Sequence, residues 1–395
     1  MPIVDCAGRH VTPGLIDAHN HSAIVGGVNE GTNSCTAEVR IGDVVNSETI
    51  DIYRQLAGGT TTVNLLHGSA NCMGGQSQVI KLRWGASPED LKFKEAKPAI
   101  KFALGENVKQ SNWGEKYTTR YPQTRMGVEQ FMREKFTEAR DWAKAGAVRV
   151  RTGERPPRRD LQLETLAEIL RGDRSVHCHS YRQDEILMLM RVAEDFDFRI
   201  GTFQHILEGY KVADEMAKHG VMASSFTDWW AFKFEVYDAI PHNPALMRDR
   251  GVIVSVNSDS TELARRMNLE AAKVAKWGGV PREEALHFVT INPARQLGVE
   301  DVTGSIEVGK AADLVVWSGD PLSTSSRAEK TYVDGLLYFD RETDLAGRAA
   351  LATERAEFVA AARKARDEAA SGEPWRPSYL ETNAGCMDGV EGGAE

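Results

Sequence analysis

Short β-rich apolar runs alternate with amphipathic helical patterns, and this alternation constrains the fold more than any other feature. Helical spacing of apolar residues marks 128–146, 184–196 and 209–220. The β-rich runs occupy 14–19, 60–67, 98–104, 147–152, 174–180, 198–205, 220–226 and 251–259. An alternation of strand and helix repeated about eight times predicts an α/β fold, a (β/α)8 TIM-type barrel over residues 13–297.

The pattern changes after Leu297. Residues 298–345 contain β-rich pieces punctuated by Gly and Asp-Pro, which predicts a small sheet outside the barrel. Residues 346–395 begin with a helical stretch and continue into a tail rich in Gly, Glu and Pro, for which we expect a flexible segment.

Composition excludes several classes of protein. The net charge of −9 argues against a general nucleic-acid or anionic-membrane binder, because both need a basic surface. No apolar run approaches the roughly 18 residues of a membrane span. Five scattered cysteines without a CxxC pair form neither a disulfide framework nor a cysteine zinc site. With no signal peptide visible at its start, the chain is expected to be cytoplasmic.

Histidines gather at the ends of the predicted strands. In "VTPGLIDAHNHS", His19 and His21 are two residues apart, so both imidazoles lie on one face of a strand. His179, His205 and Asp259 end the fifth, sixth and eighth predicted strands. Active sites of such barrels lie at these C-terminal ends, and neutral imidazole is a good metal ligand. The pattern predicts a divalent-metal site with zinc as the first choice and manganese or iron as alternatives.

At these motifs the chain resembles the amidohydrolase superfamily of metal-dependent hydrolases, in its imidazolonepropionase-like and prolidase-like branch. The resemblance runs from "VTPGLIDAHNH" through "VHCHSYRQDEI", "GTFQHILEGY" and "VNSDS" to "TINPARQLGVEDVTGSIEVGKAADLVVWSGDPL". It implies that His19 and His21 bind the more buried metal and that His179 and His205 bind the second. Asp259 would then serve as a ligand and as the general base.

Two assignments remain open at this point. Either His177 or His179 could be the fifth-strand ligand, and family spacing favours His179. Binuclear relatives usually bridge their metals with a carboxylated lysine on strand four, but "AVRVRT" has no lysine. On the third strand, Glu106 is slightly favoured as the bridging ligand, and a carboxylated Lys101 is the alternative. One or two metal ions are compatible with this set.

These parts predict hydrolysis of a C–N bond in a small-molecule amide or cyclic amide. A metal ion lowers the pKa of its bound water to about 7, and Asp259 would accept the proton. No serine lies in a GxSxG context. The alternatives are deamination of an amino-heterocycle by the same ligands and a non-catalytic scaffold. His67 and His242 are the candidate substrate contacts in the loops.

The resemblance also predicts a small β-sandwich beside the barrel. Its N-terminal half is represented only by residues 1–12, a remnant of that half, so we expect the sandwich to be incomplete on that side. An open sheet edge invites pairing, which predicts a homo-oligomer or a partner segment that completes the sheet.

Overall fold

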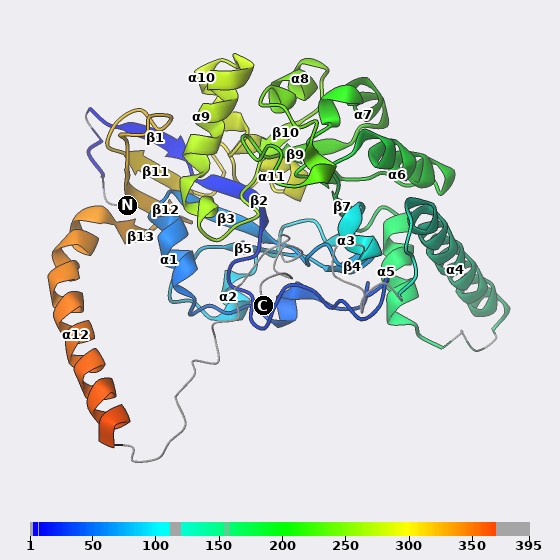
Figure 1. Cartoon of the computed structure of the whole chain (residues 1–395), viewed down its shortest axis with the longest axis horizontal. Coiled ribbons are helices and arrows are strands. Elements are labelled where there is room, and N and C mark those ends of the chain that lie inside the picture. Colours follow the sequence, from blue (N-terminus) through cyan, green and yellow to red (C-terminus); the bar gives the residue numbers. More distant parts are fainter. Residues whose placement is uncertain (1–2, 7, 111–119, 154, 156–157, 369–395) are drawn as a thin grey trace.

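The computed structural model describes residues 3–6, 8–110, 120–153, 155 and 158–368 (Figure 1). The predicted tail after 368 lies outside these ranges. Among the described helices, none is both long and apolar enough to cross a membrane.

Parallel strands form the centre of the molecule. Seven of the eight predicted β-rich runs form strands, and these are β2 (Leu15–Asn20), β3 (Thr60–Leu65), β6 (Ala99–Ala103), β7 (Ser175–His179), β8 (Thr202–Gln204), β9 (Met222–Ser225) and β10 (Val254–Val256). Strands β6 to β10 pair in parallel in chain order, and β2 pairs in parallel with β3. Every residue of β2, β3, β6 and β7 is buried, as expected when both faces of a parallel sheet are covered.

The predicted fourth strand, 147–152, is wrong. These residues are the last turns of α4 (Arg125–Thr152), which passes Gly146 and stops only where Gly153 adopts a left-handed conformation, with φ of 74°. Val148 and Val150 are exposed, so their alternation with arginine reflects no buried sheet face. Propensity alone produced the β signal here, and the continuing helix overrode it.

Two antiparallel strands that sequence analysis did not predict lie between β3 and β6. They are β4 (Met73–Gln76) and β5 (Gln78–Lys81), separated by one residue. Strand β5 pairs with β3, and β4 pairs with β6. The segment 73–81 therefore links the edges of the two sheets that carry the parallel strands.

Helices surround these strands (Figure 1). The predicted helix over 128–146 lies within α4, and the one over 184–196 corresponds to α6. The predicted helix over 209–220 is a short 3-10 helix, Gly209–Lys211, followed by α7, which Gly220 ends in the left-handed region. The helices around the parallel strands are α1 (Ile50–Leu56), α2 (Pro88–Leu91), α3 (Glu106–Lys109), α4, α5 (Leu161–Leu170), α6 (Gln183–Asp195), α7 (Ala213–His219), α8 (Asn243–Asp249), α9 (Met267–Gly278), α10 (Arg282–His287) and α11 (Ile291–Leu297).

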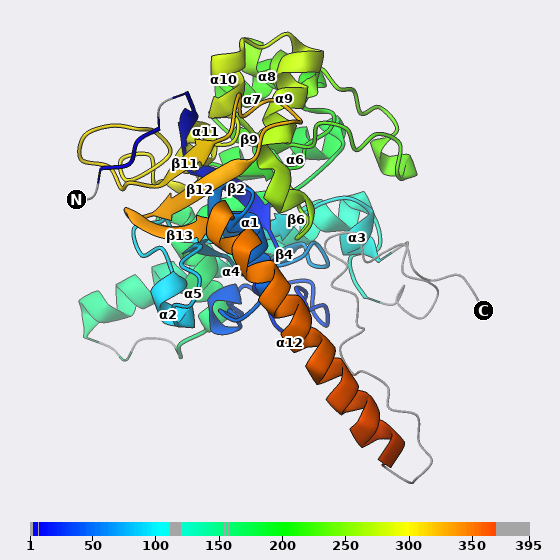
Figure 2. The same ribbon diagram turned by 90° about the vertical axis from the view of Figure 1, so that its left-hand side faces the viewer.

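A separate antiparallel sheet lies beside the parallel strands. Its order is β1 (His10–Pro13), β11 (Leu314–Trp317), β12 (Ala328–Val333) and β13 (Leu336–Asp340), so the start of the chain pairs with a segment 300 residues away. Helix α12 (Arg341–Glu368) follows β13 directly and projects away from the body of the molecule (Figure 2).

A buried ion pair joins this outer sheet to the parallel strands. Lys81, at the end of β5, is buried, and its Nζ lies 3.0 Å from Asp313 Oδ2. Asp313 also accepts hydrogen bonds from the Thr303 hydroxyl at 2.7 Å and from the Asp334 backbone N–H at 2.8 Å. Lys81 Nζ also pairs with Asp334, so removing the Asp313 carboxylate leaves the buried ammonium group with one carboxylate instead of two.

We expect Asp313→Ala to lower the free energy of unfolding by about 2 kcal/mol, since the buried Lys81 ammonium group loses one of its two carboxylate partners and two further donors lose their acceptor. Denaturant unfolding measures this, with the exposed Asp301→Ala as a matched control. The double variant Lys81→Met/Asp313→Asn should recover most of the loss. A cost for Asp313→Ala no larger than that of an exposed ion pair, below about 1 kcal/mol, would contradict this assignment.

Candidate metal centre

Strand β2 delivers two imidazoles to one buried point. His19 and His21 lie at and just beyond its C-terminal end, and their Nε2 atoms are 3.1 Å apart. His21 Nδ1 lies 2.9 Å from the Leu66 carbonyl oxygen, so Nδ1 carries the proton and donates it. This hydrogen bond orients the His21 ring so that Nε2 faces the cluster, the orientation that a metal ligand needs.

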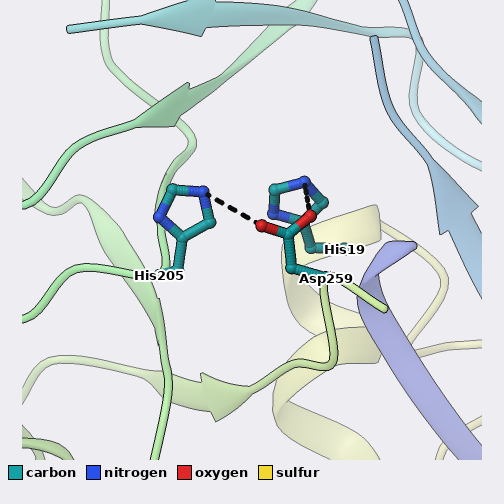
Figure 3. Close-up of side chains that lie close together, drawn as sticks. All are labelled: His19, His205 and Asp259. Atoms are coloured by element: carbon teal, nitrogen blue, oxygen red, sulfur yellow. Dashed lines mark ion pairs between the residues drawn. The ribbon is translucent and has the colours of Figure 1, made fainter. Parts of the chain in front are cut away.

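Asp259 lies between His19 and His205 (Figure 3). Its Oδ1 is 2.9 Å from His21 Nε2 and 3.3 Å from His19 Nε2, and its Oδ2 is 3.9 Å from His205 Nε2. One potential ligand atom from each of His19, His205 and Asp259 lies within 4.8 Å of the others. The backbone N–H of Asp259 donates to the His19 carbonyl at 3.1 Å, which joins the segment after β10 to β2.

His179 ends β7 and lies against His205, with ring centroids 4.4 Å apart. Tyr181 contacts both rings, at 4.7 and 5.0 Å between centroids, and Phe226 stacks on His205 at 5.2 Å. Sequence analysis did not single out either aromatic residue as part of the centre. Together they give the second pair of histidines an apolar wall.

Two members of the cluster adopt unusual backbone conformations. His205 has a φ of 38° and Asp259 a φ of 45°, both in the left-handed region that residues with a Cβ seldom adopt. Strained residues of this kind concentrate at functional sites, where the surrounding structure holds them in place. His205 directly follows β8, and Asp259 lies just after β10.

Burial favours the neutral form of His19, His179 and His205. It lowers the pKa of His19 and of His179 well below the usual range, and it lowers the pKa of His205 to about 3 despite the opposing charge of Asp259. Burial would raise the pKa of Asp259, but the hydrogen bond from His21 Nε2 and the charges of His21 and Lys101 outweigh it and lower the pKa. The centre thus combines neutral nitrogen donors with an ionised carboxylate.

A buried polar network that sequence analysis missed holds β2 against the segment after β10. Asp17 accepts hydrogen bonds from the Ser258 hydroxyl at 2.5 Å, the Ser258 N–H at 3.1 Å and the Asn20 amide at 2.9 Å. Burial is the main cause that raises the pKa of Asp17 to about 6. The only signal in the sequence was its position two residues before His19 on the same strand, which places it on the same face.

Lys101 and Glu106 occupy very different places. Lys101, on β6, is fully buried, and its Nζ lies 3.1 Å from His19 Nε2. Glu106 begins α3 and is partly exposed, with Oε1 3.2 Å from Lys109 Nζ and 3.2 Å from Arg125 Nη2. The structure therefore places the lysine, rather than the glutamate, in contact with a histidine of the cluster.

His177 lies deeper among the strands than His179. Its Nδ1 accepts a hydrogen bond from the Gln204 side-chain amide at 2.9 Å, and burial lowers its pKa to about 4. Gln204 lies on the neighbouring strand β8. His177 thus takes part in a contact between adjacent strands, while His179 contacts His205.

The two candidate substrate contacts, His67 and His242, have different surroundings. His67 is buried, its Nδ1 lies 2.9 Å from the Gly68 carbonyl oxygen, and its Nε2 accepts the Glu30 backbone N–H at 2.8 Å. Both of its ring nitrogens are therefore engaged by the backbone. His242 is exposed at the start of α8.

Comparison with known proteins assigns the family. The family model described as "Amidohydrolase family" matches residues 10–337. The chain belongs to the amidohydrolase family. A crystal structure of an amidohydrolase from Thermotoga maritima MSB8 is 34% identical and matches with a TM-score of 0.80, covering 86% of this chain and 90% of that one. The resemblance predicted from sequence motifs is confirmed.

Two curated relatives support the same family, and the matched region covers only part of the length of each. Amidohydrolase tasK of Hapsidospora irregularis is 30% identical over 368 residues, covering 86% of this chain and 37% of that protein. Imidazolonepropionase of Thermoplasma volcanium is 35% identical over 101 residues, covering 24% of this chain and 25% of that protein. The amidohydrolase family consists of metal-dependent hydrolases, and the buried His19, His205 and Asp259 group is consistent with metal binding.

We expect His67 to make stability depend on pH. Its pKa is lowered from 6.5 to about 4, chiefly by burial, so between these values the unfolded chain binds a proton at this position and the folded chain does not. Stability should therefore fall as the pH drops from about 6.5 to about 4, by at most roughly 3 kcal/mol from this residue.

Urea unfolding of chelator-treated protein at pH 7.5 and 5 measures the effect without a contribution from metal loss. His67→Gln, which keeps a donor and an acceptor but does not titrate, should make the dependence less steep by the share of one histidine, because the buried His19, His177, His179 and His205 also have lowered pKa values. The exposed His242→Gln is the control. An equally steep dependence in His67→Gln would show that other groups cause it.

Proposed function

We propose that this protein hydrolyses a C–N bond of a small amide or cyclic amide at a zinc centre held by His19, His21, His179, His205 and Asp259. The observation that carries the proposal is the convergence of buried, neutral imidazoles on one ionised carboxylate. As the scaffold we propose a closed barrel of the parallel strands and the β4–β5 segment, with the outer sheet as part of an incomplete sandwich.

The residues of the cluster fit a divalent cation. Within the described structure, neither ring nitrogen of His179 or His205 has a hydrogen-bond partner, although all four atoms are buried. Buried polar atoms without partners are costly, and a metal ion would satisfy them. Imidazole nitrogens with one carboxylate are the donors that zinc prefers, and manganese or iron is compatible with the same set.

Asp259 is the group that would move the proton. A bound divalent cation supplies a water whose pKa is lowered from 15.7 to about 7. The lowered pKa of Asp259 keeps its carboxylate ionised and able to accept a proton at neutral pH. His21 holds Oδ1 at 2.9 Å, while Oδ2 points toward His205, so the carboxylate is oriented between the two pairs of histidines. After accepting the proton, Asp259 would pass it to the leaving nitrogen.

We propose Lys101 as the bridging position. Two dications close together need an anionic ligand between them, and Lys101 Nζ is buried 3.1 Å from His19 Nε2. Addition of carbon dioxide to its uncharged amine would form a carbamate and release one proton, which converts the lysine into an anionic oxygen ligand. Glu106 already pairs with Lys109 and Arg125, away from this position.

We expect Asp259→Asn to retain metal and lose at least about 10²-fold in kcat, in the range for removal of a general base. Metal analysis of the purified protein and turnover of N-acyl amino acids, dipeptides, hydantoins and lactams measure the two quantities. Asp249→Asn, an exposed position on α8, is the control. Unchanged turnover would remove Asp259 from this role, and absence of tightly bound metal after reconstitution would overturn the proposed function.

The bridge has its own test. Lys101→Met, which keeps the length of the side chain without its amine, should lower the metal content from two ions to one or fewer and reduce activity. Glu106→Gln should leave the metal content unchanged, because the Glu106 carboxylate already pairs with Lys109 and Arg125. Metal loss in Glu106→Gln with full metal content in Lys101→Met would reverse the assignment.

A further inference from the structure

A polar cavity lies outside the metal centre, where α1, the short helix Leu263–Arg266, the first turn of α9, the start of β12 and the start of α12 meet. Its volume is about 480 Å³. Figure 2 shows α12 leaving the body of the molecule beside α1 and β12. All charged residues that line this cavity in the described structure are arginines, namely Arg54, Arg265, Arg266, Arg327, Arg341 and Arg348. We call it the arginine cavity.

Half of these arginines have carboxylate partners that lie outside the lining. Arg265 pairs with Glu262 at 2.5 Å, and Arg348 pairs with Asp344 at 2.8 Å. Arg54 makes longer contacts, at 3.7 Å to Asp51 and 3.8 Å to Glu262. Six cations therefore face three carboxylates, which leaves a local excess of positive charge on a chain whose net charge is −9.

The other three arginines, Arg266, Arg327 and Arg341, have no carboxylate within 4.0 Å among the described residues. Two of them are oriented by neutral groups. Arg327 Nη1 donates to two backbone carbonyls of its own loop, at 2.8 Å each, and Arg341 Nε donates to the Ala328 carbonyl at 2.8 Å. Carbonyl contacts fix a guanidinium group without neutralising its charge.

Helix geometry adds to this excess. Asn268 and Leu269, which line the cavity, lie in the first turn of the 12-residue helix α9, and its N-cap residue makes no side-chain cap hydrogen bond. The first backbone N–H groups of a helix lack intrahelical acceptors and carry partial positive charge. Helix α12 also begins at this cavity, with Arg341, but its N-terminus adds little, because Asp340 accepts the Thr343 N–H and Glu342 and Asp344 lie in its first turn. The last turn of the short helix α1 opposes the contribution of α9.

We propose that the arginine cavity binds a small anion that carries phosphate groups. Planar guanidinium groups match phosphate oxygens with two parallel hydrogen bonds, and a helix N-terminus is a suitable place for a phosphate. The confined volume and the acidic character of the rest of the chain favour a small ligand over an extended polyanion. None of the lining residues belongs to the metal cluster, so this proposal is independent of the hydrolase activity.

Inorganic pyrophosphate is the probe, titrated calorimetrically into the metal-loaded full chain at low ionic strength. We expect one site whose affinity falls as salt is added. Arg266→Ala/Arg327→Ala should weaken binding at least roughly ten-fold, since it removes two charged donors. Neither residue has a carboxylate partner or a buried side chain, so the variant is expected to fold and to keep the hydrolytic activity of the parent.

Three further arms decide the outcome. Arg151→Ala/Arg191→Ala removes two exposed charges elsewhere and should bind pyrophosphate like the parent. His19→Ala should also retain binding, because it alters only the metal cluster. Duplex DNA should not compete with pyrophosphate.

Four results would overturn the proposal. They are absence of pyrophosphate binding by the parent, equal loss in both arginine double variants, loss in His19→Ala with retention in Arg266→Ala/Arg327→Ala, and tighter binding of DNA than of pyrophosphate at the same site. The third result would place the anion on the metal, and the fourth would change the class of ligand.

Discussion

Burial of imidazoles around a single carboxylate is the constraint on which the rest of this structure depends. A histidine exposed to water at neutral pH is partly protonated, and a protonated ring cannot bind a metal. Here burial lowers the pKa of His205 to about 3. Asp259 lies close to the imidazoles of His19, His21 and His205. The same burial makes an unsatisfied ring nitrogen costly, so the features that suit the cluster for a metal also make it unfavourable without one.

Buried polar contacts between distant segments hold the strands around the cluster in place. Asp17 accepts hydrogen bonds from Ser258 and Asn20 and thereby holds β2 next to the segment that carries Asp259. Lys81 and Asp313 connect β5 to the outer sheet through a buried ion pair. Both links join segments more than 200 residues apart in the chain, so the geometry of the centre depends on the whole fold rather than on any local motif.

The arginine cavity shows a different use of charge on the same chain. In the metal centre, burial disfavours protonation of the imidazoles. In the arginine cavity, six guanidinium groups remain charged beside three carboxylates and the N-terminus of α9. The first arrangement suits the binding of a cation and the second the binding of an anion, and they involve different residues.

Local chemistry determined much of what could be predicted. The i, i+2 spacing of His19 and His21, and the positions of His179, His205 and Asp259 at or just beyond strand ends, follow from the periodicity of a β-strand. The family followed from motifs read in order along the chain. The same local rules failed at 147–152, because a β-prone run can continue a helix that has already formed, and at 73–81, because a Gly-rich segment has little intrinsic preference. Only tertiary packing decided that Lys101 contacts His19 while Glu106 faces Arg125, and that Asp17 braces the segment after β10, since these choices depend on side-chain distances across strands that the sequence places far apart.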